Sequence, residues 1–163
     1  YYYKTVPQTS YIKWDPDEYK QFWNRFGYVF LPQLIDTTTF DSYMELKMKY
    51  IEGTSPYDMD KKMPITFNFG LLIQYISNKI IPSFYEWSRL TEQEGKYRYG
   101  KIFIHSDLTP PNFLITKKGK IWLIDIDSIC WRTFEEIQEI TYSQDLFISD
   151  ESSPTNTKKI TFI

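Results

Sequence analysis

The sequence contains a single cysteine, Cys130, and a single histidine, His105. One cysteine excludes an internal disulfide framework, and no segment resembles a secretion signal or an apolar run of membrane length. An excess of charge is also lacking, because 19 Lys and Arg residues stand against 21 Asp and Glu residues, which gives a formal net charge of -2. That balance gives no global attraction for nucleic acid or an anionic membrane. We therefore expect a cytoplasmic protein with neither partner, in which local groups bind any anionic ligand.

Aromatic residues are plentiful, with 14 Tyr, 12 Phe and 5 Trp among 163 residues, and 42% of the sequence is hydrophobic. A domain of this length buries roughly 70% of the surface that its unfolded chain exposes, so a genuine core is expected. This composition does not favour disorder over most of the length. The polar stretch 150–157 is an exception, because it carries little signal for folding. The sequence predicts a folded globular protein of about one domain.

The first fifty residues contain patterns of strand and of helix. Residues 1–6 favour a strand through their aromatic and β-branched side chains. A helix is expected to begin at Asp15, because a carboxylate there accepts from free backbone N–H groups and the following Pro16 tolerates the first helical position. Gly27 is expected to end this helix. Two further strands are expected at 28–31 and 43–51, joined by a Thr- and Asp-rich loop at 36–41.

The second half of the sequence predicts a long helix followed by short strands. Apolar residues recur at helical spacing over 67–90, and Pro82 within this run predicts a bend. Four residues, 117–120, are expected to form the turn of a β-hairpin. The other expected elements are strands at 101–104, 113–116 and 121–124 and a helix at 134–140.

Two oxygen-bearing side chains flank this expected hairpin. Asn112 precedes its first strand, and Asp125 follows its second. If the turn holds four residues, Thr116 pairs with Ile121, and the same register brings Asn112 opposite Asp125. Opposed residues have Cβ atoms roughly 4.5–5.5 Å apart. A carboxylate and an amide oxygen at that separation suit Mg²⁺, which takes few protein ligands together with phosphate oxygens. The sequence thus predicts a magnesium site at Asn112 and Asp125.

Three nearby residues have more than one interpretation. Asp107 would stand at the mouth of the site, where a carboxylate can orient a substrate hydroxyl and accept its proton, or it caps a turn. Asp127 is either a further metal ligand or a solvent-facing residue, since it shares a face with Asp125 only if the strand continues. A lone histidine in a loop is more often structural, so His105 is expected to hold the loop.

The spacing of these residues resembles a known superfamily. The pattern His105-x-Asp107-Leu108-x-x-x-Asn112, followed by Asp125, resembles the catalytic loop and metal-binding aspartate of the protein-kinase-like superfamily. The neighbouring letters, His-Ser-Asp-Leu-x-Pro-x-Asn-Phe-Leu-Ile and then Ile-Asp-x-Asp, look more like aminoglycoside phosphotransferases and choline kinases. With this resemblance, His105 and Asp107 are the candidate catalytic residues, and Asn112, Asp125 and Asp127 are the candidate metal ligands.

The resemblance implies an α+β, protein-kinase-like two-lobe fold that is partial. Residues 1–53 would form an incomplete N-terminal lobe of antiparallel strands plus one helix, ending in a hinge. Residues 54–163 would form a mostly helical C-terminal lobe that carries the catalytic-loop hairpin. No glycine-rich phosphate loop precedes Lys4, and helices that usually follow in the family are not seen. We therefore expect either a chain truncated at one or both ends or a minimal or degenerate member.

Weaker matches imply the nucleotide site. The segment Met48-Lys49-Tyr50-Ile51-Glu52-Gly53 is similar to the family's hinge, in which backbone groups, here those of Tyr50 and Ile51, hold adenine. Lys4 and Glu18 are similar in order and spacing to the phosphate-binding lysine and its ion-pair partner. Lys4 is alternatively an ordinary edge-strand lysine, and Glu18 is alternatively part of a capping box with Asp15. Asp145 looks like the aspartate that braces the catalytic loop.

These features favour a phosphotransferase that uses ATP and Mg²⁺ to phosphorylate a hydroxyl of a small molecule. Two other functions remain open: a catalytically inactive nucleotide-binding or scaffold domain, and a lone Asp-x-Asp metal motif as in glycosyltransferases or haloacid-dehalogenase-type phosphatases. No local pattern selects choline, a sugar, an amino alcohol or an aminoglycoside as the acceptor. The sequence does not indicate an oligomeric state.

Overall fold

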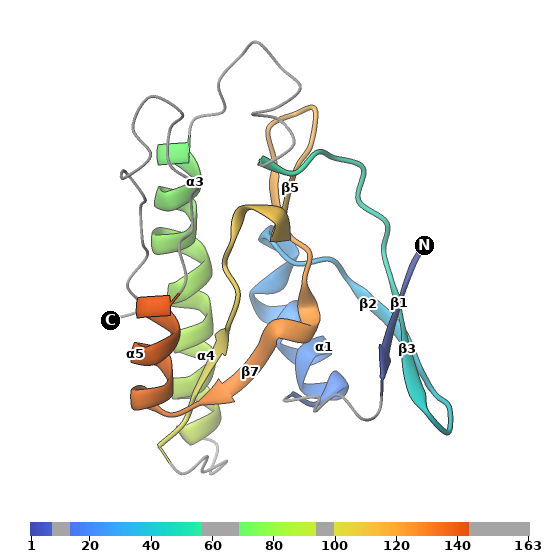
Figure 1. Ribbon diagram of the computed structural model, residues 1–163, viewed down its shortest axis with the longest axis horizontal. Helices are drawn as coiled ribbons and strands as arrows, with labels where there is room; N and C mark the ends of the chain where they lie inside the picture. Colours follow the sequence, from blue (N-terminus) through green and yellow to red (C-terminus); the bar gives the residue numbers. More distant parts are fainter. Residues whose placement is uncertain (8–13, 57–68, 94–99, 144–163) are drawn as a thin grey trace.

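The computed structural model describes residues 1–7, 14–56, 69–93 and 100–143. Within these ranges the chain is a mixed α/β structure of small antiparallel sheets and a few helices (Figure 1). A three-stranded sheet lies on one side and a long helical run lies on the other, with the helix α1 (Pro16–Arg25) between them. None of the helices in those ranges combines the length and the apolar character needed to cross a membrane.

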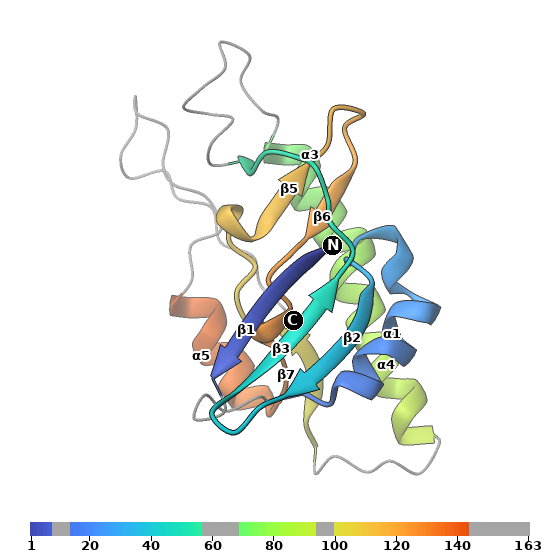
Figure 2. The same ribbon diagram turned by 90° about the vertical axis from the view of Figure 1, so that its right-hand side faces the viewer.

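The three-stranded sheet has the antiparallel order β1-β3-β2, and its strands are β1 (Tyr2–Pro7), β2 (Leu34–Thr39) and β3 (Tyr43–Met48). Figure 2 shows the sheet in front of α1 and the helix α4 (Ile81–Gln93). Side chains of β3 alternate between half-buried and buried, so one face of the sheet packs on the core. Lys4 lies directly opposite the buried Leu46. Lys4 is therefore on the face of the sheet that points into the molecule.

The helix α1 begins as the sequence predicts. The carboxylate of Asp15 accepts a hydrogen bond from the backbone N–H of Asp17 at 3.0 Å, and Pro16 occupies the first turn. The buried side chains of Glu18, Tyr19 and Phe22 face the core. The helix ends at Arg25, and Gly27 opens a 3₁₀ turn, Gly27–Val29.

A continuous helical run carries the predicted irregularity near Pro82. It consists of α3 (Phe69–Tyr75), a π-helical turn (Ile76–Ile80) and α4 (Ile81–Gln93). In the wider turn, the N–H of Ile81 donates to the carbonyl of Ile76. Pro82 has no N–H to donate to the preceding turn, which removes one ordinary helical hydrogen bond at this point. The sequence predicted a bend near Pro82, and the structure has a π turn that ends two residues before this proline.

Two small antiparallel ladders carry the motif residues. One pairs β4 (Ile102–His105) with β7 (Ile129–Arg132), and the other pairs β5 (Phe113–Ile115) with β6 (Ile121–Leu123). The helix α5 (Phe134–Ser143) follows β7 and agrees with the helix expected at 134–140. Because β4 and β7 are paired, the loop after His105 lies beside the segment that leads into Ile129.

One buried cluster unites residues from before and after Gly53. The ring of Phe22 in α1 packs on rings of α4 and β4, with centroids 4.8 Å from Phe84, 5.8 Å from Trp87 and 5.4 Å from Phe103. Aromatic pairs at these separations add to the energy of apolar burial. This cluster holds α1 against α4 and β4. The division of the chain into lobes at residue 53 remains a prediction.

Several local predictions were wrong. The strand expected at 28–31 is instead the end of the 3₁₀ turn and the segment after it, whereas much of the loop expected at 36–41 belongs to β2. Three consecutive threonines in that segment suit a strand, because β-branched side chains fit a pleated surface. The strand β3 ends at Met48, earlier than expected. Asp145 and the polar stretch 150–157 lie outside the described residues.

Candidate active site

The hairpin turn is one residue shorter than the sequence suggested. Phe113 pairs with Leu123 and Ile115 with Ile121, so the turn proper is 117–119. Gly119 has φ +82°, and its N–H donates to the carbonyl of Thr116 at 2.9 Å. Three-residue hairpin loops commonly contain one residue in the left-handed conformation, and glycine adopts it readily. The prediction of a four-residue turn overlooked this alternative.

This register corrects the predicted opposition of Asn112 and Asp125. The N–H of Ile124 donates to the carbonyl of Asn112 at 2.9 Å, so Ile124 and not Asp125 lies opposite Asn112. Asp125 instead comes directly after this pairing and leads into the 3₁₀ turn Ile126–Ser128. Asn112 and Asp125 nevertheless line the same cavity. The two side chains are thus brought together by the end of the hairpin and not by a cross-strand pair.

His105 connects the loop after β4 to the segment after β6. Its Nδ1 accepts from the backbone N–H of Asp107 at 3.1 Å, and its Nε2 lies 2.5 Å from the carbonyl oxygen of Asp125. These partners require a neutral ring with the proton on Nε2. Burial lowers the pKa of His105, more than the nearby carboxylates and the carbonyl raise it. The geometry supports the expectation that His105 holds the loop.

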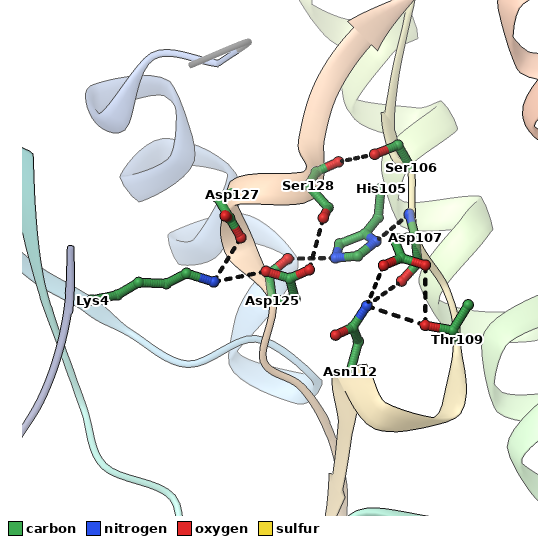
Figure 3. A network of polar contacts seen from close by, with 9 residues as sticks. All are labelled: Lys4, His105, Ser106, Asp107, Thr109, Asn112, Asp125, Asp127 and Ser128. Carbon is green, nitrogen blue, oxygen red and sulfur yellow. Dashed lines mark hydrogen bonds and ion pairs between the residues drawn. The ribbon is translucent and has the colours of Figure 1, made fainter. Parts of the chain in front are cut away.

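Asp107 and Asn112 lie in the loop that follows β4. The side-chain N–H groups of Asn112 donate to the carbonyl oxygen of Asp107 at 2.8 Å and to its carboxylate at 2.9 Å. The other carboxylate oxygen accepts from the hydroxyl of Thr109 at 3.0 Å. Asn112 ends the 3₁₀ turn Pro110–Asn112, which begins at a proline suited to the first helical position. Figure 3 shows the side-chain oxygen of Asn112 turned toward the side on which Asp125 lies.

Asp125 is held on both of its carboxylate oxygens. One oxygen accepts from the ammonium of Lys4 at 2.8 Å, and the other accepts from the hydroxyl of Ser128 at 2.8 Å. Ser106, directly after β4, holds the 3₁₀ turn Ile126–Ser128 in place, because its N–H and its hydroxyl donate to the carbonyl of Ser128 at 2.8 and 2.9 Å. Sequence reasoning missed Ser106 and Ser128. The position of Ser128 directly after Asp-x-Asp was the available signal.

Lys4 is shared by two aspartates. Its ammonium lies 2.8 Å from Asp125 and 2.7 Å from Asp127, and Figure 3 shows it approaching both from the side of the sheet. Burial lowers the pKa of Lys4, but its hydrogen bonds to the two carboxylates outweigh burial and leave that pKa raised. Asp127 does not need a continuing strand to reach this cluster, because the 3₁₀ turn brings it there.

The two carboxylates have unlike environments. Burial opposes the charge on Asp125, but hydrogen bonds with Asp127, Lys4 and Ser128 outweigh burial and hold the pKa of this carboxyl well below its usual range. Burial and the neighbouring Asp125 raise the pKa of Asp127. Asp125 is therefore the carboxylate that stays ionised over the wider pH range.

Glu18 lies apart from Lys4 in this structure. Its carboxylate accepts from the indole N–H of Trp87 at 3.1 Å and from that of Trp131 at 3.2 Å, and the residue is only 6% exposed. These contacts tie α1 to α4 and β7. The expected ion pair between Lys4 and Glu18 is therefore not formed, since the ammonium is directed to the aspartates. Sequence reasoning missed Trp87 and Trp131, and no local pattern marked them.

A cavity of about 460 Å³ collects most of the predicted binding residues. Lys4, Tyr50, Ile51, Asn112 and Asp125 all line it, and its apolar lining includes Met48, Leu114 and Ile124. This volume falls within the range of small-molecule sites. His105, Glu18, Asp107 and Asp127 are not part of its lining. A second cavity of about 430 Å³ shares residues 49–51 with the first, and its lining also includes Trp23, Trp122 and Lys120.

The linker 49–54 is attached at both ends. The N–H of Lys49 donates to the carbonyl of Gln33 at 2.9 Å, and Thr54 and Ile115 exchange two backbone hydrogen bonds of 3.0 and 2.8 Å. Gly53 passes so close to β5 that an added Cβ would lie 2.8 Å from the carbonyl oxygen of Ile115. The linker therefore has a defined position along one wall of the cavity.

The oxygen atoms of this site fit a magnesium ion. No group of three His, Cys, Asp or Glu side chains in the described ranges is arranged to hold a metal by itself. Mg²⁺, however, is usually bound through one or two carboxylates together with phosphate oxygens and water. Asn112 and Asp125 supply an amide oxygen and a carboxylate at one cavity, and Asp127 adds a second carboxylate beside Lys4. This donor set suits the ion with a phosphate ligand present.

No known protein family and no curated protein matches the sequence. Among solved structures, the chain is similar to three variants of the PknI kinase domain of Mycobacterium tuberculosis, each with 17% identity and a TM-score of 0.41. The similarity covers 77% of this chain and 49%, 48% and 47% of those chains. The chain thus spans about half the length of these kinase domains. A likeness of this size carries no argument about function, which depends on the geometry of the site.

Proposed function

We propose that this chain is a kinase-like phosphotransferase domain that binds ATP with Mg²⁺ and transfers the γ-phosphate to a hydroxyl of a small molecule. One observation carries the proposal: Lys4 of β1 lines one cavity, beside the linker 49–51, together with Asn112 and Asp125 from the two ends of a distant hairpin. Asp107 is hydrogen-bonded to Asn112 and so lies next to that cavity. In this set, Lys4 is a cation that can bind phosphate, and Asn112 and Asp125 supply oxygen ligands for a metal ion. The carboxylate of Asp107 can accept a proton.

The cavity suits a nucleoside triphosphate. Met48, Leu114 and Ile124 give the cavity an apolar lining that suits a planar base. No described residue is hydrogen-bonded to the backbone N–H or C=O of Tyr50 or Ile51, so these groups are available to the edge of a base. Lys4 lies at the same cavity with the charge needed for phosphate oxygens.

The residues around the metal ligands act as supports. Mg²⁺, when bound, would be held by Asn112 and Asp125, with Asp127 as a further ligand, and would neutralise charge on the phosphate oxygens. Ser128 fixes the carboxylate of Asp125, and His105 fixes its backbone. Such contacts orient ligands and reduce the reorganisation needed for binding.

Asp107 is the residue proposed to receive the proton. As the acceptor oxygen bonds to the γ-phosphorus, the bond from phosphorus to the β–γ bridging oxygen breaks, ADP leaves, and the hydroxyl proton passes to the Asp107 carboxylate. Asn112 and Thr109 orient this carboxylate through hydrogen bonds. General base assistance of this kind contributes about 10²–10⁴-fold, and positioning of the reactants supplies much of the remainder.

A second candidate function is nucleotide binding without transfer. Both carboxylate oxygens of Asp107 accept hydrogen bonds within their own loop, and Lys4 is engaged by two aspartates. In a catalytic domain, Asp107 and Lys4 must break these contacts, or form additional ones with the substrates, when the substrates bind. In a binding or scaffold domain they would persist.

The test is a titration with a fluorescent ATP analogue and Mg²⁺, followed by a transfer assay with ATP labelled at the γ-phosphate. Acceptors would include choline, ethanolamine, simple sugars and aminoglycosides, with a generic protein substrate for comparison. We expect saturable binding that Asp125→Asn weakens, and label transfer to a small hydroxyl compound. Binding without any transfer would favour the second function, and label on protein alone would contradict the small-molecule acceptor. A lack of binding would contradict both functions.

A further inference from the structure

Lys4 and a bound metal would require the same carboxylate oxygens. The ammonium of Lys4 lies 2.8 Å from Oδ1 of Asp125 and 2.7 Å from Oδ1 of Asp127. The second oxygen of Asp125 already accepts from Ser128. Both oxygens of the central metal ligand therefore have a donor within the chain, and the cation among these donors is Lys4 (Figure 3).

We propose that Lys4 is an internal cation latch, which occupies the metal-binding carboxylates and keeps divalent metal affinity low until a nucleotide draws the ammonium away. The proposal rests on the proposed function, because it concerns the same metal ligands. It goes further by stating how the two ligands depend on each other: the metal binds weakly when it is alone and more tightly together with the nucleotide.

The ion pairs of the latch are partly protected from solvent. The side chain of Lys4 is 23% exposed and that of Asp125 is 19% exposed, whereas that of Asp127 is 41% exposed. Partly buried pairs are screened less than pairs on the open surface. The ion pair between Lys4 and Asp125 therefore opposes metal binding more strongly than the ion pair between Lys4 and Asp127, and the effects of the two pairs add.

The position of Lys4 allows a nucleotide to release the latch. Lys4 and Asp125 line the same cavity, so phosphate groups bound there would offer the ammonium alternative anionic oxygens. A lysine has a flexible stem and three rotatable donors, which lets it change partners without movement of β1. Because the coupling between two ligands is reciprocal, metal would in turn raise the affinity for the nucleotide.

The experiment measures Mn²⁺ binding by electron paramagnetic resonance in the absence of nucleotide, for the whole chain and for Lys4→Met. The variant should bind Mn²⁺ about tenfold more tightly than the wild type, which corresponds to about 1.4 kcal/mol. The matched control is Lys47→Met, which removes the same charge from the same sheet. Lys47 lies over the ring of Tyr1 at 4.3 Å and next to the buried Leu46, on the opposite face from Lys4. Its removal should change the Mn²⁺ affinity by less than about twofold.

Two additions make the result specific. With ADP present, the advantage of Lys4→Met should disappear, because the nucleotide has already released the latch in the wild type. In Lys4→Met combined with Asp125→Asn, the tighter binding should be lost. If Lys4→Met does not fold, as judged by circular dichroism, Lys4→Gln provides the same loss of charge and keeps a hydrogen-bond donor for Asp125.

Each contrary result has a separate meaning. Equal Mn²⁺ affinities for the wild type and the neutral Lys4 variant overturn the latch and leave the proposed metal site intact. A gain that survives Asp125→Asn also overturns the latch, because the metal then lies elsewhere. If no variant binds Mn²⁺ with or without ADP, the metal site of the proposed function fails and the latch fails with it.

Discussion

The ring of His105 joins the loop after β4 to the segment after β6, since Nε2 lies 2.5 Å from the carbonyl oxygen of Asp125 while Nδ1 accepts from the N–H of Asp107. Residue 105 is only 1% exposed, so this connection lies inside the protein. The backbones of Asp107 and Asp125 are consequently held by opposite sides of one neutral ring. Loss of that neutrality would disturb both.

Stability should therefore decrease at mildly acidic pH. Burial lowers the pKa of His105 from its usual value of 6.5, so below pH 6.5 the unfolded chain binds more protons than the folded chain. The stabilisation is complete above the unfolded pKa and is lost as the pH falls toward the folded pKa. Between pH 7.5 and 5.5 the free energy of unfolding should decrease by up to about 1.4 kcal/mol.

Urea denaturation at the two pH values checks this expectation. His105 is the only histidine, so no other imidazole contributes. In His105→Gln, an amide can keep the donor to Asp125 and cannot titrate, so this part of the pH dependence should vanish. An equal pH dependence in the wild type and the variant would contradict the assignment.

Glu18 should matter for stability more than for nucleotide contact. Glu18→Ala removes an acceptor from the indole N–H groups of Trp87 and Trp131 inside the protein, at a cost of about 2–5 kcal/mol. A double-mutant cycle with Trp87→Phe, measured by urea denaturation, gives the share that belongs to one indole. Additive effects would show that this hydrogen bond contributes little.

Gly53 should be sensitive to any side chain. In Gly53→Ala, the Cβ would meet the carbonyl oxygen of Ile115 at 2.8 Å, which must push the linker away from β5. We expect a loss of about 1–3 kcal/mol in stability and weaker binding of a fluorescent ATP analogue. The control is Gly100→Ala, because Gly100 has φ +70° and no atom lies within 4 Å of an added Cβ there. It should cost about 1–2 kcal/mol in stability and leave nucleotide affinity unchanged. Equal nucleotide affinities in both variants would argue against a hinge role for the linker.

Gly119 should set the register of the hairpin. Because φ is +82° there, Gly119→Ala should destabilise the protein by about 1–2 kcal/mol, whereas Gly119→Asn should cost less. Nothing lies within 4 Å of an added Cβ, so a difference between the two variants reports the backbone conformation. Thermal denaturation would show it, and identical effects would point to a different turn.

The sequence predicted those elements that depend on local chemistry. The cap at Asp15 and the strand that carries Lys4 both follow from the preferences of a few adjacent residues. The meeting of Asn112 and Asp125 was also foreseen, although for the wrong reason. A single left-handed residue, Gly119, changes the register by one, and the sequence allowed both a three-residue and a four-residue turn.

Contacts between residues far apart in the chain could not be predicted from the sequence. The strand β7 and its pairing with β4 depend on chain segments that meet only in the folded protein. The choice of Lys4 between Glu18 and the aspartates likewise depends on where α1 is held by Trp87 and Trp131. The family resemblance made Glu18 the expected partner, but the tertiary arrangement places the two aspartates at the ammonium.

The central claim is that Asp107 accepts a proton during phosphoryl transfer in a site that binds ATP and Mg²⁺. The most direct test compares Asp107→Asn with the wild type in single-turnover transfer and in nucleotide binding. Transfer to the acceptor should decrease by about 10²–10⁴-fold, while the dissociation constant for the nucleotide should stay within about twofold, because Asp107 does not line the cavity proposed to bind the nucleotide. Undiminished transfer by Asp107→Asn would contradict the account.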